Sequence, residues 1–143
     1  MNDPFDLERF TKAQQGIYQI ALAELHRGAK ESHWMWFIFP QLSGLGRSPT
    51  AAFFAIHSAG EARAYLGHPR LGPRLYECVE AILDWSAKRT ATEILGDIDS
   101  IKLRSSLTLF DQVQSHSVFA SALDSFFDGA RDERTLALLN SGR

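Results

Sequence analysis

Signals that begin and end helices constrain this chain more than any other feature of its sequence. Three segments show capping-box spacing, in which Ser or Thr precedes Glu or Gln by three residues. These pairs are Thr11 with Gln14, Ser58 with Glu61 and Thr90 with Glu93. After the first pair, apolar residues recur at intervals of three and four until Gly28 supplies a left-handed stop. The chain is therefore predicted to form a succession of amphipathic helices.

Seven or eight helices of unequal length are expected, and no pair of segments shows convincing strand alternation. Helices are predicted at residues 11–27, 69–85, 97–113 and 118–128, with a short one at 58–66 and a last one beginning at Asp132. Shorter helices or turns are expected before Phe10, from Ser32 to Pro40 and after Thr90. Residues 51–56 fit neither period cleanly, and a helix is preferred there. This pattern predicts an all-α fold with irregular, orthogonal packing rather than an up-down bundle.

The length and composition fit one compact domain spanning residues 1–143. A chain of 143 residues, 45% of them hydrophobic, can bury a core without a disulfide or a metal. Its single cysteine, Cys78, cannot form an intrachain bridge and lies on an apolar helical stripe, which indicates an inert core thiol. The formal charge of -2, with no basic cluster, argues against nucleic acid as a partner.

The sequence also argues against export and membrane insertion. The first residues lack the basic start and apolar core of a signal peptide. The longest apolar run, from Trp34 to Pro40, is far shorter than the roughly 20 residues that a membrane helix needs. A cytoplasmic location with no membrane partner is therefore expected.

The most unusual segment is the aromatic stretch, residues 30–41, which crowds five rings, counting His33, into a dozen positions. So apolar a run should be buried. Its polar side chains, Ser32, His33 and Gln41, must then find hydrogen-bond partners or line a cavity that admits a polar ligand.

His33 is the candidate catalytic residue in the aromatic stretch, because its imidazole titrates near neutrality. The alternative for His33 is a core histidine that a backbone carbonyl satisfies. Trp34 and Trp36 are candidates for stacking a planar ligand, although aromatic residues at this spacing are more often core. Lys30 resists burial and is a candidate for holding an anionic group.

A second polar set lies on the predicted helix from Asp97 to Asp111. Lys102, Ser105 and Thr108 project within one broad sector of this helix, whereas apolar residues fill the other sectors. Hydroxyls in mid-helix are tolerated when they bond back to carbonyls or face a polar cavity. They are candidates for lining a pocket against the aromatic stretch, with Lys102 supplying positive charge. The alternative is a solvated face.

Known catalytic and cofactor motifs are absent from the sequence. It contains no H-E-x-x-H, no P-loop and no C-x-x-C. Gly44 and Gly46 lack the third glycine and the preceding strand of a dinucleotide-binding site. No metal site is predicted, no cofactor is assigned, and the sequence leaves open whether the protein is an enzyme.

Several strings in the sequence resemble the domain-of-unknown-function family numbered eighteen-ten, sometimes labelled calpastatin in bacterial genomes. They include Asp3-Pro4-Phe5, the string from Ser32 to Gln41, Gly44-Leu45-Gly46, Ala55-Ile56, Ala64-Tyr65-Leu66, His68-Pro69, Leu71-Gly72, Lys102-Leu103, the string from Ser105 to Phe110, and Thr135-Leu136. The resemblance covers nearly the whole chain. It implies a small, mainly helical bacterial domain and supplies no reaction, and nothing in the sequence supports the calpastatin label.

Two functions are expected from these patterns. The first is a domain that binds or processes a small polar, anionic or planar ligand in a pocket between the aromatic stretch and the helix of residues 97–111. His33 would move a proton there. The candidate ligand-binding residues are Lys30, Ser32, Trp34, Trp36, Gln41, Lys102, Ser105 and Thr108. The second is a non-catalytic protein-interaction module or homodimer, with the aromatic stretch as core or interface.

Overall fold

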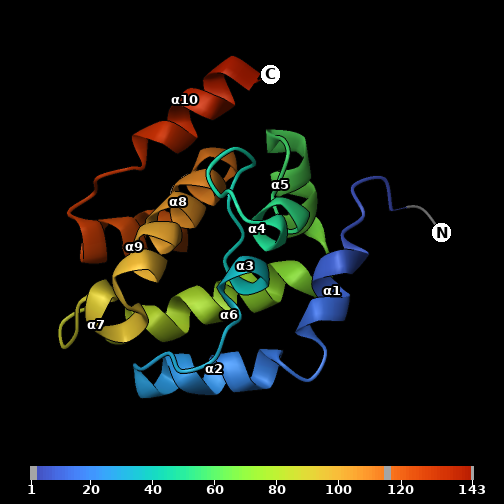
Figure 1. Ribbon diagram of the computed structural model, residues 1–143. Coiled ribbons are helices and arrows are strands. Elements are labelled where there is room, and N and C mark those ends of the chain that lie inside the picture. The colour runs from blue at the N-terminus through green and yellow to red at the C-terminus, as the bar shows by residue number, and fades with distance from the viewer. Residues whose placement is uncertain (1–2, 115–116, 143) are drawn as a thin grey trace.

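The computed structural model describes residues 3–114 and 117–142, and these residues form ten helices (Figure 1). The helices are α1 (Glu8–Gln14), α2 (Tyr18–Arg27), α3 (Met35–Ile38), α4 (Pro49–Phe53), α5 (Ala59–Gly67), α6 (Leu71–Leu83), α7 (Ala91–Leu95), α8 (Asp97–Val113), α9 (Val118–Phe127) and α10 (Glu133–Gly142). The one β-pairing within the described ranges is an isolated parallel bridge between Leu42 and Ile56. The all-α prediction is confirmed, and the expected number of seven or eight helices is too low.

The boundary between the first two helices differs from the prediction, because the predicted helix 11–27 is interrupted. Gly16 adopts a φ of +72°, in the left-handed region that favours glycine, and separates α1 from α2. Thr11 consequently lies inside α1, where its hydroxyl donates to the Glu8 carbonyl at 3.1 Å instead of capping a helix. The first predicted capping box is therefore wrong.

The other two predicted capping boxes mark helix starts in the structure. The Ser58 hydroxyl accepts the Glu61 amide at the start of α5. Thr90 and Glu93 satisfy each other's backbone amides at the start of α7. Asp97–Val113 has the predicted bounds in α8. The helix expected from Ser32 to Pro40 is shorter, because only the single turn α3 forms there.

Helix α6 crosses the middle of the molecule, with α2 along one side of it and α5 and α9 also against it (Figure 1). Helix α8 packs on α5, α7, α9 and α10. A chain of rings joins four helices through the core, with centroid distances of 5.1 Å for Phe10–Tyr65, 5.4 Å for Tyr65–Phe110 and 5.7 Å for Phe110–Phe119. Helices from distant parts of the sequence thus share one apolar interior.

Gly28 fixes the direction in which the chain enters the aromatic stretch. Its φ of +70° ends α2, and a Cβ at this position would lie 2.6 Å from the Trp85 ring. The Arg89 guanidinium donates to the Gly28 carbonyl at 2.7 Å, and the Lys30 amide donates to the Ile94 carbonyl at 2.8 Å. The start of the aromatic stretch is therefore held against the segment that precedes α7 and against α7 itself.

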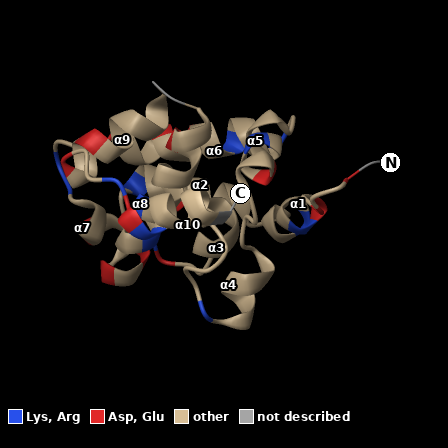
Figure 2. Cartoon of the chain, turned by 90° about the horizontal axis from the view of Figure 1, so that it is seen from above, with Lys and Arg blue, Asp and Glu red and all other residues tan. Residues whose placement is uncertain are grey.

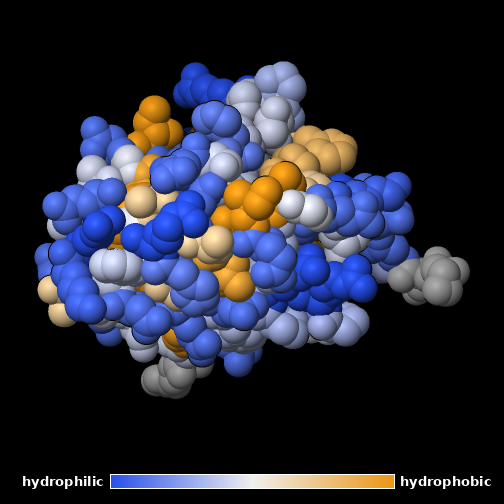
Figure 3. All heavy atoms as spheres, turned by 90° about the horizontal axis from the view of Figure 1, so that it is seen from below, coloured by the Kyte–Doolittle hydropathy of each residue, from blue (hydrophilic) through white to orange (hydrophobic). Residues whose placement is uncertain are grey.

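The helices differ widely in length, from 4 residues in α3 to 17 in α8. Among the described residues, none of them is both long enough and apolar enough to cross a bilayer. The face turned downward in Figure 1 is mostly hydrophilic, with a small group of hydrophobic residues near its centre (Figure 3). Most of the apolar side chains lie in the interior.

Candidate functional site

The buried carboxylate of Glu24 fixes the start of the aromatic stretch through hydrogen bonds. Glu24, on the inner face of α2, accepts four hydrogen bonds: from the Glu31 amide at 2.8 Å, the Ser32 amide at 2.9 Å, the Ser32 hydroxyl at 2.6 Å and Trp34 Nε1 at 2.9 Å. Ser32 and Trp34, two of the candidate ligand-binding residues, therefore donate to a group of the protein itself.

Among the described residues, no cation forms an ion pair with the Glu24 carboxylate. Hydrogen bonds stabilise its anionic form instead. Burial raises the pKa of this carboxyl, but the hydrogen bonds from Ser32, Glu31 and Trp34 outweigh that effect and lower it to about 2. Sequence reasoning missed Glu24. The available signal was its position three residues after Ala21 and one before Leu25, on the apolar face of the helix.

Four candidate residues, Lys30, Trp34, Trp36 and Lys102, meet around Asp99, and we call these five residues the lysine–tryptophan cluster. Lys30 Nζ lies 3.0 Å from Asp99 Oδ2 and 5.0 Å from the centroid of the Trp34 ring. Lys102 Nζ lies 3.8 Å from Asp99 Oδ1 and 5.3 Å from the centroid of the Trp36 ring. Asp99 was not among the predicted site residues.

The cluster carries two ammonium groups on one carboxylate. The Lys30 side chain is 9% exposed and the Lys102 side chain is 25% exposed. Solvent therefore screens the charge of Lys102 less completely than it screens a fully exposed lysine. Each ammonium also lies over an indole ring, a geometry that favours a cation. Figure 2 shows basic and acidic positions next to one another around α8, where this cluster lies. The cluster itself has one positive charge more than its single aspartate balances.

Ser105 and Thr108 lie in a different environment, against the start of α10. The Ser105 hydroxyl donates to the Ile101 carbonyl at 3.3 Å and to Asp132 Oδ2 at 3.2 Å. Thr108 Oγ1 donates to the Arg104 carbonyl at 2.8 Å and accepts the Asp132 amide at 2.9 Å. Both hydroxyls bond to carbonyls one turn earlier in α8 and to Asp132, just before α10. None of these hydrogen bonds involves a residue of the lysine–tryptophan cluster.

His33 and Gln41 are the remaining candidates. His33 is exposed to solvent. Gln41 is half-buried beside Trp36, and its backbone carbonyl accepts the Ile56 amide at 2.9 Å. The recess that Trp36 and Gln41 share has a volume of about 10 Å³, close to the space of one water molecule. A ligand at the lysine–tryptophan cluster would therefore bind on its outer side rather than in that recess.

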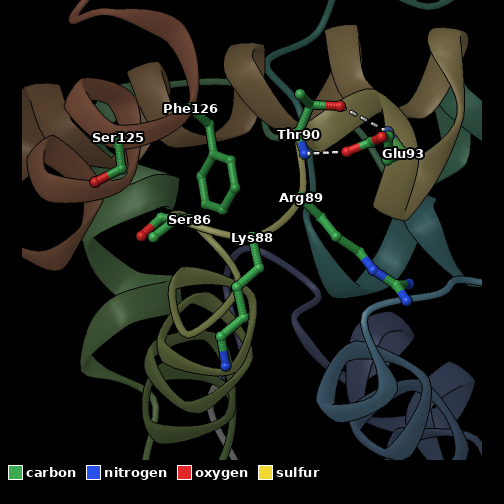
Figure 4. A pocket seen from close by; sticks show the side chains of 8 residues that line it. Ser86, Lys88, Arg89, Thr90, Glu93, Ser125 and Phe126 are labelled. Atoms are coloured by element: carbon green, nitrogen blue, oxygen red, sulfur yellow. Dashed lines mark hydrogen bonds between the residues drawn. The ribbon is translucent and has the colours of Figure 1, made fainter.

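A larger hollow of about 280 Å³ lies between α9 and the connection from α6 to α7 (Figure 4). Three of its polar side chains are engaged elsewhere, because Thr90 and Glu93 cap α7 and Arg89 binds the Gly28 carbonyl. In Figure 4, Lys88 and Arg89 point away from Phe126. No convergent set of polar groups faces this hollow, so we do not assign it a ligand.

Two further groups bear on chemistry. Cys78 is buried, and burial raises the pKa of its thiol to about 12, so it is a core residue rather than a nucleophile. Within the part of the chain that the structure describes, no three His, Cys, Asp or Glu side chains are grouped so as to hold a metal ion.

Comparisons with known proteins agree with the fold and leave the chemistry open. A family model described as "Protein of unknown function (DUF1810)" matches residues 4–139. The crystal structure of the conserved hypothetical protein Rv1873 from Mycobacterium tuberculosis is similar to this chain. Its TM-score is 0.93, with 47% sequence identity, and the match covers 96% of this chain and 99% of that chain. No curated protein matches the chain.

Proposed function

The chain belongs to the DUF1810 family of proteins of unknown function, and we propose that it binds a small anionic ligand at the lysine–tryptophan cluster. The observation that supports this proposal is the meeting of Lys30 and Lys102, from segments far apart in the sequence, on opposite oxygens of Asp99. Two ammonium groups that share one carboxylate have capacity for a second anion.

Asp99 takes the position in which a ligand carboxylate or phosphate would bridge the two lysines. Its Oδ2 faces Lys30 at 3.0 Å and its Oδ1 faces Lys102 at 3.8 Å. A ligand with two or more anionic oxygens would compete with Asp99 for Lys102, the more exposed and more distant partner. The half-buried Trp36 ring beside Lys102 offers a face for a planar moiety, so a nucleotide-like or sugar-phosphate ligand suits the cluster.

The proposal is for binding and assigns no reaction. Ser32 and Trp34 contribute indirectly, because their bonds to Glu24 fix the segment that carries Lys30. Gln41 contributes through its position next to Trp36. His33 is the proton-transferring candidate that solvent, and therefore a bound ligand, can reach.

Titration with inorganic phosphate and with adenosine monophosphate tests this proposal, with tryptophan fluorescence and calorimetry as readouts. We expect Lys102→Ala to weaken binding about tenfold, equivalent to about 1.4 kcal/mol, because it removes one of the two cations. We expect Asp99→Asn to strengthen binding several-fold, because it removes the internal competitor. Lys12→Ala is the matched control, since Lys12 is exposed and pairs only weakly with Glu8 at 3.9 Å.

The Lys12→Ala control makes the test specific. A general loss of positive charge would weaken binding by Lys12→Ala and Lys102→Ala alike, so a loss confined to Lys102→Ala indicates the cluster. Equal affinity in the wild type, Lys102→Ala and Asp99→Asn would rule the cluster out as the anion site.

Homodimer formation is the second candidate function, and exposed isoleucines on α8 favour it. Ile98 and Ile101 are 70% and 63% exposed and stand three residues apart on one face of the helix. Apart from Trp36, the large apolar side chains of the aromatic stretch are buried, so in this proposal that stretch supplies core and the isoleucines supply the interface.

Sedimentation velocity over a range of protein concentrations tests the homodimer. We expect the wild type to show a dimer fraction that rises with concentration, and the double variant Ile98→Ser, Ile101→Ser to remain monomeric. Ile20→Ser is the control, because Ile20 is an exposed isoleucine on α2. A wild type that stays monomeric throughout the range would refute this second candidate.

A further inference from the structure

A cavity of about 310 Å³ lies between the start of α5 and the end of α10, and it shares no residue with the lysine–tryptophan cluster. Its lining residues are Leu42, Ser43, His57, Ser58, Ala59, Leu138, Leu139 and Ser141. The volume is at the lower end of the range for small-molecule sites.

The lining divides into an apolar and a polar part. Leu42, Leu138 and Leu139 supply branched apolar side chains, whereas three serine hydroxyls and the His57 imidazole supply hydrogen-bonding groups. None of the lining residues is Lys, Arg, Asp or Glu. A cavity without a permanent charge in its lining favours a neutral ligand with an apolar body and a polar head.

The orientation of the His57 ring is set by Glu61. His57 Nδ1 lies 3.2 Å from Glu61 Oε1, and the same oxygen accepts the His57 amide at 3.1 Å. The other Glu61 oxygen pairs with the Arg9 guanidinium at 2.7 Å. The two Glu61 oxygens thus accept from a backbone amide and from a guanidinium.

This arrangement determines which ring nitrogen a ligand meets. In the tautomer whose Nδ1 donates to Glu61, Nε2 presents a lone pair. The described residues provide no hydrogen-bond partner for Nε2. In this tautomer His57, a lining residue whose side chain is 62% exposed, offers an acceptor beside the leucine-lined cavity.

We infer that this cavity is a second ligand site, which takes a small neutral molecule with an apolar ring or chain and one hydroxyl group. The hydroxyl donates to His57 Nε2, and the apolar body lies against Leu42, Leu138 and Leu139. The apolar side of the cavity depends on the approach of α10, whose Leu138 lies close enough to Gly44 that a Cβ there would be 3.4 Å from it.

Titration of the full chain with phenol, followed by nuclear magnetic resonance, tests the inference. Toluene is the matched probe without a hydroxyl, and benzoate is the anionic probe. We expect phenol to shift the His57 ring nitrogen signals together with the methyl signals of Leu138 and Leu139. Toluene and benzoate should bind at least about fivefold more weakly than phenol, because neither can donate to Nε2.

Three variants separate recognition from stability. His57→Phe keeps a ring but removes Nε2, and we expect it to weaken phenol binding about fivefold while leaving toluene binding unchanged. Leu138→Trp fills the cavity without changing His57, and we expect it to abolish binding of both probes. His26→Phe, at an exposed position of α2, is the control and should bind phenol as the wild type does.

Two results would overturn the inference. Equal binding of phenol and toluene by the wild type would show that no hydroxyl is recognised. Phenol binding by His57→Phe or Leu138→Trp at wild-type strength would place the probe elsewhere. Lys102→Ala should leave phenol binding unchanged, so the outcome is independent of the anion proposal.

Discussion

Replacing Arg9 with alanine is expected to destabilise the protein by about 3–5 kcal/mol, the largest effect among these predictions. The side chain is only 6% exposed and its guanidinium makes five hydrogen bonds. The acceptors are the backbone carbonyls of Phe5, Asp6, Phe53 and Ala55 and the carboxylate of Glu61. Its loss leaves several carbonyls and one oxygen of the 3%-exposed Glu61 carboxylate without this donor.

Urea denaturation of Arg9→Ala measures this loss, with Arg27→Ala as the matched control. Arg27 pairs with Glu31 at 3.9 Å on the surface, so its removal should cost less than about 0.5 kcal/mol. The double variant Arg9→Ala, Glu61→Ala should lose less than the sum of the two single variants, because it leaves no buried charge alone. If the free energy of unfolding of Arg9→Ala lay within about 1 kcal/mol of the wild-type value, water would have replaced the guanidinium as the hydrogen-bond donor.

Acid should remove the stabilising contribution of Glu24, and Glu24→Gln should remove it at every pH. The folded-state pKa of this carboxyl is about 2, below its ordinary value of 4.5. A group with a depressed pKa in the folded state contributes stability that is fully present above about pH 4.5 and is lost as the pH falls toward 2. We expect Glu24→Gln to cost about 2 kcal/mol at pH 7, because an amide oxygen replaces a carboxylate that accepts four hydrogen bonds.

The free energies of unfolding of the wild type and Glu24→Gln, compared at pH 7, 5 and 3, check this prediction. Other carboxylates titrate equally in both proteins, so the difference between the two proteins reports on Glu24. That difference should be constant between pH 7 and 5 and smaller at pH 3. Glu93→Gln, at the exposed capping box of α7, is a control for a carboxylate on the surface. If the difference in free energy of unfolding did not shrink at pH 3, it would contradict a folded-state pKa of about 2 for Glu24.

Local chemistry explains why much of the helical pattern could be predicted. The start of α8 follows Gly96, and α7 starts directly after Thr90, whose capping partner Glu93 is only three residues further on. Gly16 shows the limit of this approach, since a glycine within an apolar helical pattern is as compatible with a continuous helix as with a break. Whether it interrupts the helix depends on the packing of α1 and α2.

The candidate site was less predictable because its contacts join distant segments. The spacing of Lys102, Ser105 and Thr108 places them in one sector of a helix, but it does not show that Asp132 approaches two of them. Glu24 resembles any solvated glutamate until the chain turns at Gly28 and brings amides over it. Arg9 finds carbonyl partners 44 and 46 residues away, a relation that no local pattern contains.

The chain of rings through Phe10, Tyr65, Phe110 and Phe119 also determines how the protein opens. These residues belong to α1, α5, α8 and α9, and the Tyr65–Phe110 contact joins the pair of helices from the first half of the sequence to the pair from the second. Regions that open separately have few such contacts with the rest of a protein. The four helices therefore form a single cooperative unit, in which α1 is as much a part as the central helices.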